Sequence, residues 1–259
     1  MAKFDIDLAR FASQVGASAG TDLLGRDTLM LAREGQLCVQ WAPFDHIPRT
    51  ARLVIVGITP GREQATNALR AFGQALQAGQ PLEAAQRHAK LVGSFSGPMR
   101  ANIVQMLDSI GVQQALGVPT CAVLFDAAHE QVHFTSALRY PVFVDGVNYN
   151  GNPPLLSTPL LRQIVETFLA EEAQLLPDAL WLPLGPKPAG ALRHLVELGL
   201  LPATRVLEGM PHPSGANAER IKFFLGLKPR AELSRKTRPD LIDLAREALL
   251  AQVGRLRSA

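Results

Sequence analysis

A short run of apolar residues that ends in a glycine-rich loop constrains this chain more than any other feature. Leu53-Val54-Ile55-Val56 is followed at once by Gly57-Ile58-Thr59-Pro60-Gly61, and a helical pattern begins after that loop. Continuous apolar runs of this length are typical of parallel strands that are buried on both faces. Because open α/β sheets bind ligands at the carboxyl ends of such strands, the loop marks an expected site.

The rest of the chain alternates apolar runs with helical patterns. Strands are expected at 52–58, 132–137, 179–184 and 205–207, and helices after 61 and around 103–110, 161–168, 188–198, 218–227 and 240–255. Residues 1–50 are expected to be a mixed lead-in, and 140–159 an irregular loop. This order predicts one α/β domain over 1–259, a three-layer α/β/α sandwich with a central, mainly parallel four-stranded sheet. Its core covers about 50–227, and 228–259 add a basic segment and a C-terminal helix.

Composition narrows the expected partners and cofactors. The two cysteines, Cys38 and Cys121, are too few for a thiolate zinc site or an iron–sulfur cluster, so no metal and no cofactor are expected. No apolar run approaches the roughly 20 residues that cross a bilayer, and the polar start is unlike a secretory signal. We therefore expect a cytoplasmic protein without a membrane partner. The net charge of +3 permits a polyanionic partner without establishing one.

Near the other end of the chain, a second loop has the same arrangement as the first: Met210-Pro211-His212-Pro213-Ser214-Gly215. It follows a short strand-like run and precedes a helical pattern, so both loops are expected to wall one pocket. His212 lies between two prolines that restrict its backbone, and an imidazole can donate to a developing negative charge near neutral pH. In the first loop, Thr59 offers a hydroxyl that can hold a water. An ordinary tight turn and a structural histidine are the alternative interpretations.

These two loops, in this order and at this spacing, resemble the motifs of the uracil-DNA glycosylase superfamily. Three further segments between Leu53 and Leu227 extend the resemblance. Leu91–Gly97 is similar to the segment that stacks an aromatic ring on the extruded base, which implies Phe95 for that role. Phe134–Ala137 is similar to the strand end that reads the uracil edge, which implies Ser136. Trp181–Gly185 is similar to the strand before the last crossover.

The resemblance implies a DNA glycosylase that hydrolyses the N-glycosidic bond of uracil or another deaminated or damaged base in DNA. It implies catalytic roles for Thr59 and His212. It implies base binding by Gly57, Ile58, Phe95 and Ser136, and binding of DNA phosphate by Gly61, Ser214 and Gly215. The chain departs from the superfamily where Thr59 replaces the usual Asn or Asp, and Ser136 the usual Asn. Two alternatives stay open: a very slow or non-catalytic member that binds bases or nucleic acid, and an α/β enzyme acting on a small phosphorylated or nucleotide ligand.

Several other residues carry weaker signals. The basic segment Lys228-Pro229-Arg230 and Arg235-Lys236-Thr237-Arg238 can follow a phosphate backbone or be a solvated face. The aromatic residues Tyr140, Phe143 and Tyr149 can stack on a single strand, and Phe143 can equally cap the core. The carboxylates that can orient a water are Glu63, Asp126 and Asp145, for which an exposed surface charge is the alternative.

Overall fold

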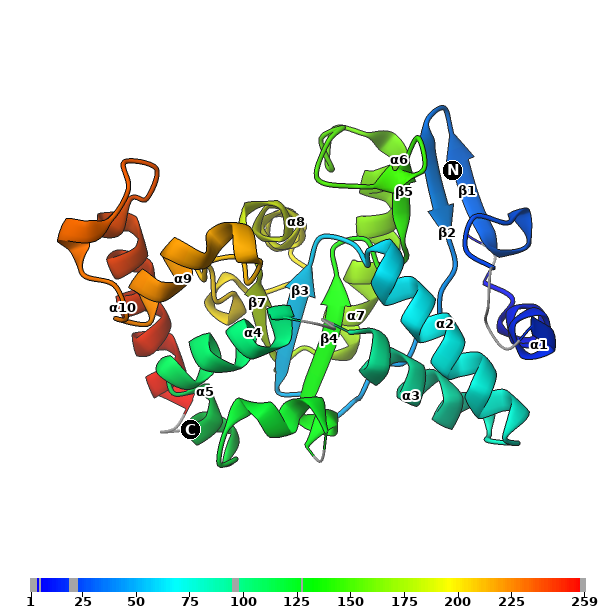
Figure 1. The fold of residues 1–259 in the computed structure, drawn as a ribbon, viewed down its shortest axis with the longest axis horizontal. Helices are drawn as coiled ribbons and strands as arrows, with labels where there is room; N and C mark the ends of the chain where they lie inside the picture. Colours follow the sequence, from blue (N-terminus) through cyan, green and yellow to red (C-terminus); the bar gives the residue numbers. More distant parts are fainter. Residues whose placement is uncertain (1–3, 5, 19–22, 95–97, 127, 257–259) are drawn as a thin grey trace. The chain divides into compact units, whose positions relative to one another are not determined.

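The computed structural model describes residues 4, 6–18, 23–94, 98–126 and 128–256 (Figure 1). Backbone contacts divide the chain into two compact units. The first unit comprises Met1–Ile47, Ile58–Ser94 and Phe134–Glu172, and the second comprises Pro48–Gly57, Phe95–His133 and Ala173–Ala259. Each unit is therefore assembled from segments that are distant in the sequence.

The apolar run at 53–56 forms the centre of a parallel sheet, as its composition predicts. It becomes strand β3 (Leu53–Gly57), all five residues of which are buried. β3 pairs in parallel with β7 (Leu180–Pro183), and β4 (Val132–Ser136) completes the order β4-β3-β7. The predicted strand at 205–207 is reduced to a single parallel bridge between Trp181 and Val206. In the described part of the chain, this sheet thus has three strands where four were predicted.

A second, antiparallel sheet lies in the first unit, where the sequence analysis expected a lead-in and an irregular loop. Its strands, in the order β1-β2-β5-β6, are β1 (Met30–Glu34), β2 (Leu37–Gln40), β5 (Val142–Val144) and β6 (Val147–Asn148). Two-residue turns close both hairpins. Gly35 has φ 55° in the first, and Asp145 and Gly146 have φ 49° and 76° in the second. Positive φ at these positions gives the turns whose twist matches that of paired strands.

Aromatic residues build the core of the first unit. The Trp41 ring stacks on Phe11 of α1 (Leu8–Ser18) with centroids 4.6 Å apart, and it meets the Phe72 ring of α2 (Arg62–Gln77) edge-on at 5.7 Å. α2 and α3 (Leu82–Gly93) form a helical hairpin and lie side by side (Figure 1). α6 (Pro159–Ile164) runs through a π-helical turn, Val165–Leu169, into α7 (Ala170–Leu175), which continues into the second unit.

The remaining helices belong to the second unit; three of them lie close to the ranges predicted around 188–198, 218–227 and 240–255, the one predicted around 103–110 begins earlier, at Pro98, and the one at 112–116 was not predicted. They are α4 (Pro98–Ser109), α5 (Val112–Leu116), α8 (Pro186–Glu197), α9 (Ala218–Phe224) and α10 (Pro239–Leu256). Short 3₁₀ turns occupy Asp27–Leu29, Cys121–Phe125, His129–Gln131, Ala203–Arg205, Gly215–Asn217 and Arg230–Glu232. Among the described residues, no helix combines the length and the apolar character needed to cross a bilayer.

The fold is therefore mixed α/β, with a parallel sheet of three strands and a separate antiparallel sheet of four. The prediction of one central four-stranded parallel sheet was wrong in two respects. Residues 205–207 offer too few apolar residues for a full strand and make one bridge, with the Leu207 N–H donating to the Trp181 carbonyl at 2.8 Å. The antiparallel strands, in turn, are too short to give a clear alternating pattern.

Gly93 allows α3 to approach α2 closely. A Cβ at this position would lie 2.8 Å from the Ala68 Cβ and 3.0 Å from the Gln64 carbonyl oxygen. We expect Gly93→Ala to lower the free energy of unfolding by about 1–3 kcal/mol, because one helix must shift to admit the methyl group. Gly190 in α8 is the control, since a Cβ there would meet only the end of the Arg193 side chain at 4.0 Å. Gly190→Ala should raise the free energy of unfolding by up to about 1 kcal/mol in urea denaturation. Equal responses of the two variants would contradict tight packing at Gly93.

Candidate functional site

The Pro-His-Pro turn of the second unit lies beside the carboxyl end of β7. A Cβ on Gly185, two residues after β7, would lie 3.6 Å from the His212 Cβ, and the φ of +98° at Gly185 suits glycine. From α4, the Asn102 amide nitrogen donates to the Pro213 carbonyl at 2.8 Å. Pro211 and Pro213 are buried, while His212 is half-buried. The turn is thus fixed on both sides and leaves the imidazole partly open to solvent.

A backbone hydrogen bond sets the tautomer of His212. The Ser214 N–H donates to the His212 Nδ1 at 3.2 Å. A ring nitrogen that accepts a hydrogen bond carries no proton, so the neutral ring has its proton on Nε2. Burial lowers the pKa of His212 below its ordinary value, which favours the neutral ring near pH 7. Nε2 has no hydrogen-bond partner among the residues that the structure describes, and its N–H is available to a ligand.

Side-chain hydrogen bonds connect the turn to α9. The Ser214 Oγ accepts from the Asn217 Nδ2 at 3.2 Å, and the Asn217 Oδ1 accepts from the Arg220 Nη1 at 2.8 Å. The 3₁₀ turn Gly215–Asn217 separates Ser214 from the start of α9. Gly215 is exposed and Ser214 half-buried. Their binding of a phosphate stays a prediction.

The first loop is divided between the units. Gly57 ends β3 in the second unit, and Ile58 to Gly61 belong to the first. The Thr59 Oγ1 donates to the Tyr140 carbonyl at 3.0 Å and accepts from the Val142 N–H at 3.1 Å. Its proton is therefore already used, and one lone pair is left that a water can donate to. Thr59 has a clear structural role, since it fastens the loop to the segment that leads into β5.

The other predicted site residues differ in their hydrogen bonds and in their exposure to solvent. The Ile58 carbonyl accepts from the Leu138 N–H at 3.0 Å. The Gly61 N–H, expected to bind phosphate, donates to the Gln64 side chain at 3.0 Å. Ser136 ends β4 and is 8% exposed. Phe95, the expected stacking residue, lies outside the described residues.

A half-buried carboxylate, Asp45, lies behind the first loop, and no sequence motif marks it. The Asp45 carboxylate accepts a hydrogen bond from the Tyr140 hydroxyl and another from the Trp41 Nε1 at 3.1 Å. Burial raises the pKa of both Asp45 and Tyr140. Tyr140 thus joins Asp45, through its side chain, to Thr59, through its carbonyl group.

Two buried cations complete this polar cluster. The Lys90 Nζ donates to the carbonyl groups of Phe44 at 2.9 Å and His46 at 2.6 Å, and burial lowers the pKa of Lys90 to about 7. The Arg139 Nε donates to the Glu172 carboxylate at 2.7 Å. Buried charges are tolerated when they are paired or hydrogen-bonded: Arg139 is paired with Glu172, and Lys90 is bound by two carbonyl groups.

The three aromatic residues considered for stacking are core residues. Tyr140 is 0% exposed, Phe143 2% and Tyr149 3%, so the interpretation that they stack on a single strand was wrong. Their rings are buried because the segment that contains them joins the antiparallel sheet through β5 and β6. For Phe143, the alternative interpretation as a core residue is confirmed.

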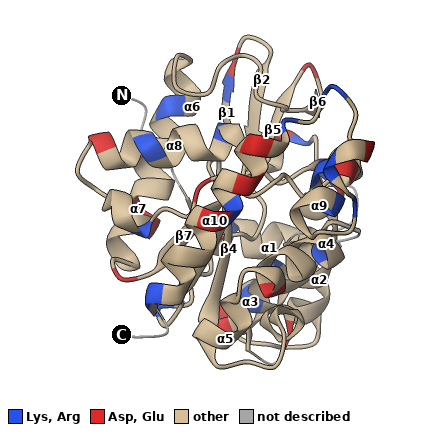
Figure 2. Ribbon diagram, turned by 90° about the vertical axis from the view of Figure 1, so that its left-hand side faces the viewer, with Lys and Arg blue, Asp and Glu red and all other residues tan. Residues whose placement is uncertain are grey.

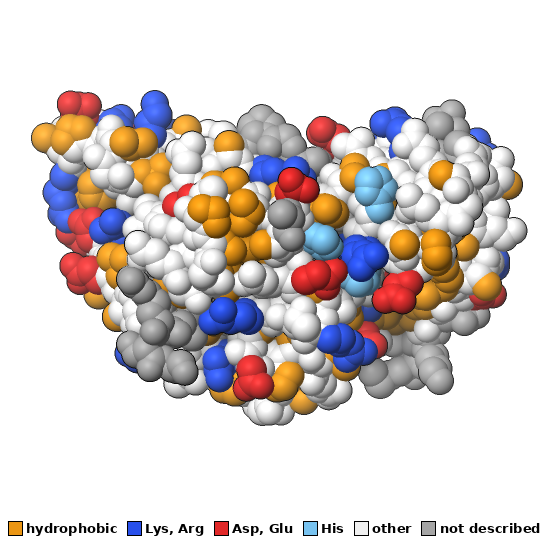
Figure 3. Space-filling view, turned by 90° about the horizontal axis from the view of Figure 1, so that it is seen from below, with side chains coloured by type: hydrophobic (Ala, Val, Ile, Leu, Met, Phe, Trp, Pro, Cys, Tyr) orange, Lys and Arg blue, Asp and Glu red, His pale blue; other side chains and the backbone are white. Residues whose placement is uncertain are grey.

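The carboxylates Glu63, Asp126 and Asp145 are exposed, and Asp145 forms the β5–β6 turn. Side chains of both charges are interspersed on the face shown in Figure 3. Within the described ranges, no three His, Cys, Asp or Glu side chains gather in a way that suits a metal ion. Cys38 and Cys121 are free thiols whose pKa values are raised by burial.

A cavity of about 320 Å³ opens between the hairpin turns of the antiparallel sheet in the first unit. Arg33 and Arg62 line it, together with Cys38, Phe143 and Asp145. The Arg62 guanidinium lies 4.6 Å from the Phe143 ring centroid and donates to the Gly146 carbonyl at 2.8 Å. The two arginines can attract a small anion, but Arg33 is already 3.9 Å from the Asp27 carboxylate and Asp145 adds a negative charge to the lining.

The described residues thus define an α/β protein in which a Pro-His-Pro turn lies at the carboxyl end of a parallel strand. The chain is 36% identical to the uncharacterized protein YoxB of Bacillus subtilis (strain 168) over 230 residues, which are 88% of this chain and 90% of YoxB. It belongs to the same protein family as YoxB. No profile of a known protein family matches the chain, and no solved structure matches it.

The tautomer of His212 can be measured directly. We expect ring ¹⁵N chemical shifts at pH 7 to show the proton on Nε2, and protonation to occur below the ordinary pKa of 6.5. Ser214→Pro removes the N–H donor at a residue whose φ of −72° already suits proline, and should abolish the tautomer preference. Ser214→Ala keeps the N–H and is the control. A ring protonated on Nδ1 in the unaltered protein would disprove the assignment.

The structural role of Thr59 predicts a loss of stability. Thr59→Val leaves the Tyr140 carbonyl and the Val142 N–H without their partner, so we expect the free energy of unfolding to fall by about 1–3 kcal/mol. Thr59→Ser keeps the hydroxyl and should lose much less. Chemical denaturation of both variants measures the difference, and equal losses would show that the two hydrogen bonds contribute little.

Proposed function

We propose that the protein is a DNA glycosylase that removes uracil or another deaminated or damaged base. The observation that carries the proposal is the His212 turn. A neutral imidazole, fixed as the Nε2–H tautomer and placed at the carboxyl end of a parallel sheet, is a donor suited to a leaving group that becomes an anion. The reaction, hydrolysis of an N-glycosidic bond, is inferred from the sequence motifs around both loops.

The chemistry follows from what the reaction requires. The target nucleotide leaves the base stack, and the bond between C1′ and the base nitrogen breaks. The electron pair of that bond goes to the base, where the His212 Nε2–H stabilises the growing negative charge. Water then adds to C1′ and loses a proton, which leaves an abasic sugar and the free base. A neutral donor serves well here, because its role is to hydrogen-bond the anion rather than to protonate it.

The remaining roles are part of the same proposal. Thr59 holds the attacking water through its free lone pair, Gly57, Ile58, Phe95 and Ser136 hold the base, and Gly61, Ser214 and Gly215 contact phosphate. The Gly61 N–H would have to leave Gln64 to do so. The proposal also includes the three-layer α/β/α arrangement of the glycosylase superfamily, DNA as the partner and the cytoplasm as the location.

One observation favours a second candidate. The cavity beside Arg33 and Arg62 has a volume of about 320 Å³, and ligand pockets range from roughly 300 to 1,000 Å³. Its two arginines would accept a small phosphorylated ligand. An α/β enzyme acting on such a ligand is the alternative to a glycosylase.

The test is base excision from oligonucleotides. We expect single- or double-stranded DNA that carries uracil, hypoxanthine, xanthine or a mismatch to yield alkali-labile abasic sites. His212→Ala should lower the rate by about 100- to 1,000-fold, the usual effect of removing one donor to a developing anion. His88→Ala, at an exposed histidine of α3, is the matched control and should leave the rate unchanged.

The other outcomes are equally informative. Salt-sensitive binding without abasic product would indicate the slow or non-catalytic alternative. Neither binding nor product would disprove the proposal and leave the small-ligand enzyme. An excision rate that His212→Ala does not change would show that the turn has no part in the reaction.

A further inference from the structure

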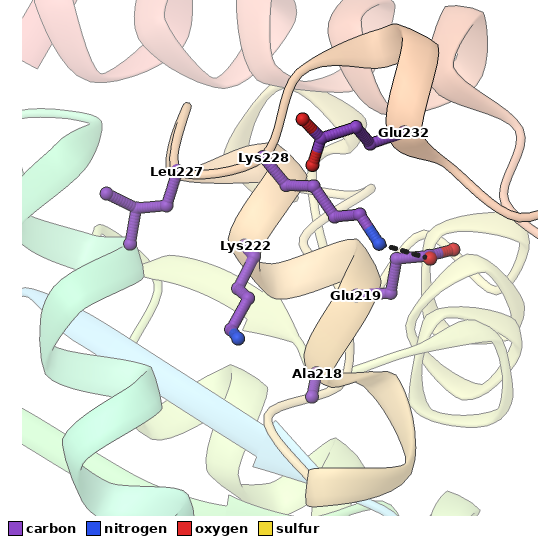
Figure 4. A pocket seen from close by; sticks show the side chains of 6 residues that line it. All are labelled: Ala218, Glu219, Lys222, Leu227, Lys228 and Glu232. Carbon is purple, nitrogen blue, oxygen red and sulfur yellow. Dashed lines mark hydrogen bonds and ion pairs between the residues drawn. The ribbon is translucent and has the colours of Figure 1, made fainter.

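One carboxylate organises the basic segment that follows α9. The Glu219 Oε1 accepts from the Ser234 hydroxyl at 2.7 Å and the Thr237 hydroxyl at 2.5 Å. The Glu219 Oε2 accepts from the Lys228 Nζ at 2.9 Å (Figure 4). The hydrogen bonds from Thr237, Lys228 and Ser234 lower the pKa of Glu219 to about 2, so it is ionised at neutral pH. The segment is thus fastened to α9 by a permanent charge.

In the loop Ser234–Arg238, the anchored Thr237 side chain is buried and the charged side chains are exposed. The Thr237 N–H donates to the Ser234 carbonyl at 3.0 Å, which closes a turn, and Thr237 is 7% exposed. Arg235, Lys236 and Arg238 are exposed instead. We call these five residues, 234–238, the basic loop.

The cations of the basic loop differ from Lys228 and Arg230 in making no ion pair, although Arg238 is near enough to Asp240 to help lower the pKa of that carboxyl. Arg230 forms ion pairs with Asp240 at 2.6 Å and Asp243 at 2.7 Å, and Lys228 is paired with Glu219. Arg235, Lys236 and Arg238 make no ion pair with any carboxylate in the described ranges. Figure 2 shows basic and acidic positions close together around α9. The absence of ion pairs therefore concerns particular cations and not the whole surface around this helix.

A cavity of about 390 Å³ adjoins the same helix. Its lining includes Lys222, which is exposed and points away from the Lys228–Glu219 pair (Figure 4). Lys222 likewise has no ion-pair partner in the part of the chain that the structure describes. It adds a fourth unpaired cation to the three of the basic loop.

Hydrogen bonds join the basic loop to the His212 turn within the second unit. The Arg220 Nη2 donates to the Lys236 carbonyl at 3.3 Å, and Arg220 also donates to Asn217. Asn217 in turn donates to Ser214, the residue whose N–H fixes His212. The loop therefore has a defined position relative to the imidazole.

We propose that the basic loop, together with Lys222, binds the sugar-phosphate backbone of the nucleic acid that the His212 turn acts on. This inference rests on the proposed function. Several unpaired cations on an open surface match a polyanion with evenly spaced charges better than a single small anion, which needs an enclosed site. Glu219 is a positioning residue, because it acts by fixing the loop that carries the cations.

The experiment measures the affinity for a fluorescent oligonucleotide, single- and double-stranded, over a range of salt concentrations. The triple variant R235A/K236A/R238A should bind roughly 100-fold more weakly at physiological salt, and its plot of log K against log salt should be shallower by about 2–3. Arg230→Ala is the comparison variant, since its charge is already paired with Asp240 and Asp243, and it should weaken binding by less than about tenfold and change the slope by no more than about 1.

Glu219→Gln separates an organised loop from simple attraction. This variant carries one more positive charge than the unaltered protein, so non-specific electrostatics predicts tighter binding. Loss of the anchor predicts the reverse, and we expect affinity to fall by roughly tenfold. Tighter binding by Glu219→Gln would show that the loop needs no anchor and would overturn its part in the proposal.

The outcomes distinguish this inference from the proposed function. If the unaltered protein excises a base while the triple variant keeps full affinity and the same salt slope, the basic loop is not a backbone-binding site and the function stands. If the unaltered protein neither binds nor cuts any oligonucleotide, the proposed function fails first. Weaker binding by both the triple variant and Glu219→Gln, with a much smaller effect of Arg230→Ala, supports the inference.

Discussion

The structure of the second unit depends on the complete burial of β3. Leu53, Val54, Ile55 and Val56 are at most 1% exposed, so their backbone groups must be satisfied inside the protein. Pairing with β4 on one side and with β7 on the other supplies those partners, and the parallel pairing with β7 brings the ends of both strands to one edge. Gly185, just beyond β7, lies beside His212. The place of the histidine is thus a consequence of how an apolar strand satisfies its hydrogen bonds.

Local patterns predicted the elements that are long or strongly apolar. β3, β4 and β7, and the helices α8, α9 and α10, begin within about two residues of their expected positions, because burial on one or both faces marks the sequence directly. The antiparallel sheet was not predicted, because strands of two to five residues show little periodicity. The Asp145-Gly146 pair was a usable hairpin signal that the surrounding prolines obscured.

The candidate site was predictable only in part, for a related reason. Two prolines around His212 are visible in the sequence, whereas its tautomer depends on the direction of the Ser214 N–H. Asp45 and Tyr140 are 95 residues apart and Arg139 and Glu172 are 33 apart, and none of them belongs to a recognisable motif. Pairing between single residues over such separations leaves no local pattern to read.

Burying the charged groups of the cluster behind the first loop costs free energy. Hydrophobic residues of similar volume often replace buried ion pairs without loss of stability, so stability alone does not explain Asp45, Lys90, Arg139 and Glu172. We infer that their role is directional, because hydrogen bonds hold particular side chains in one orientation. Asp45 fixes the Tyr140 side chain, and the Tyr140 carbonyl accepts the Thr59 proton. Through Tyr140, the cluster is therefore connected to the glycine-rich loop at Thr59.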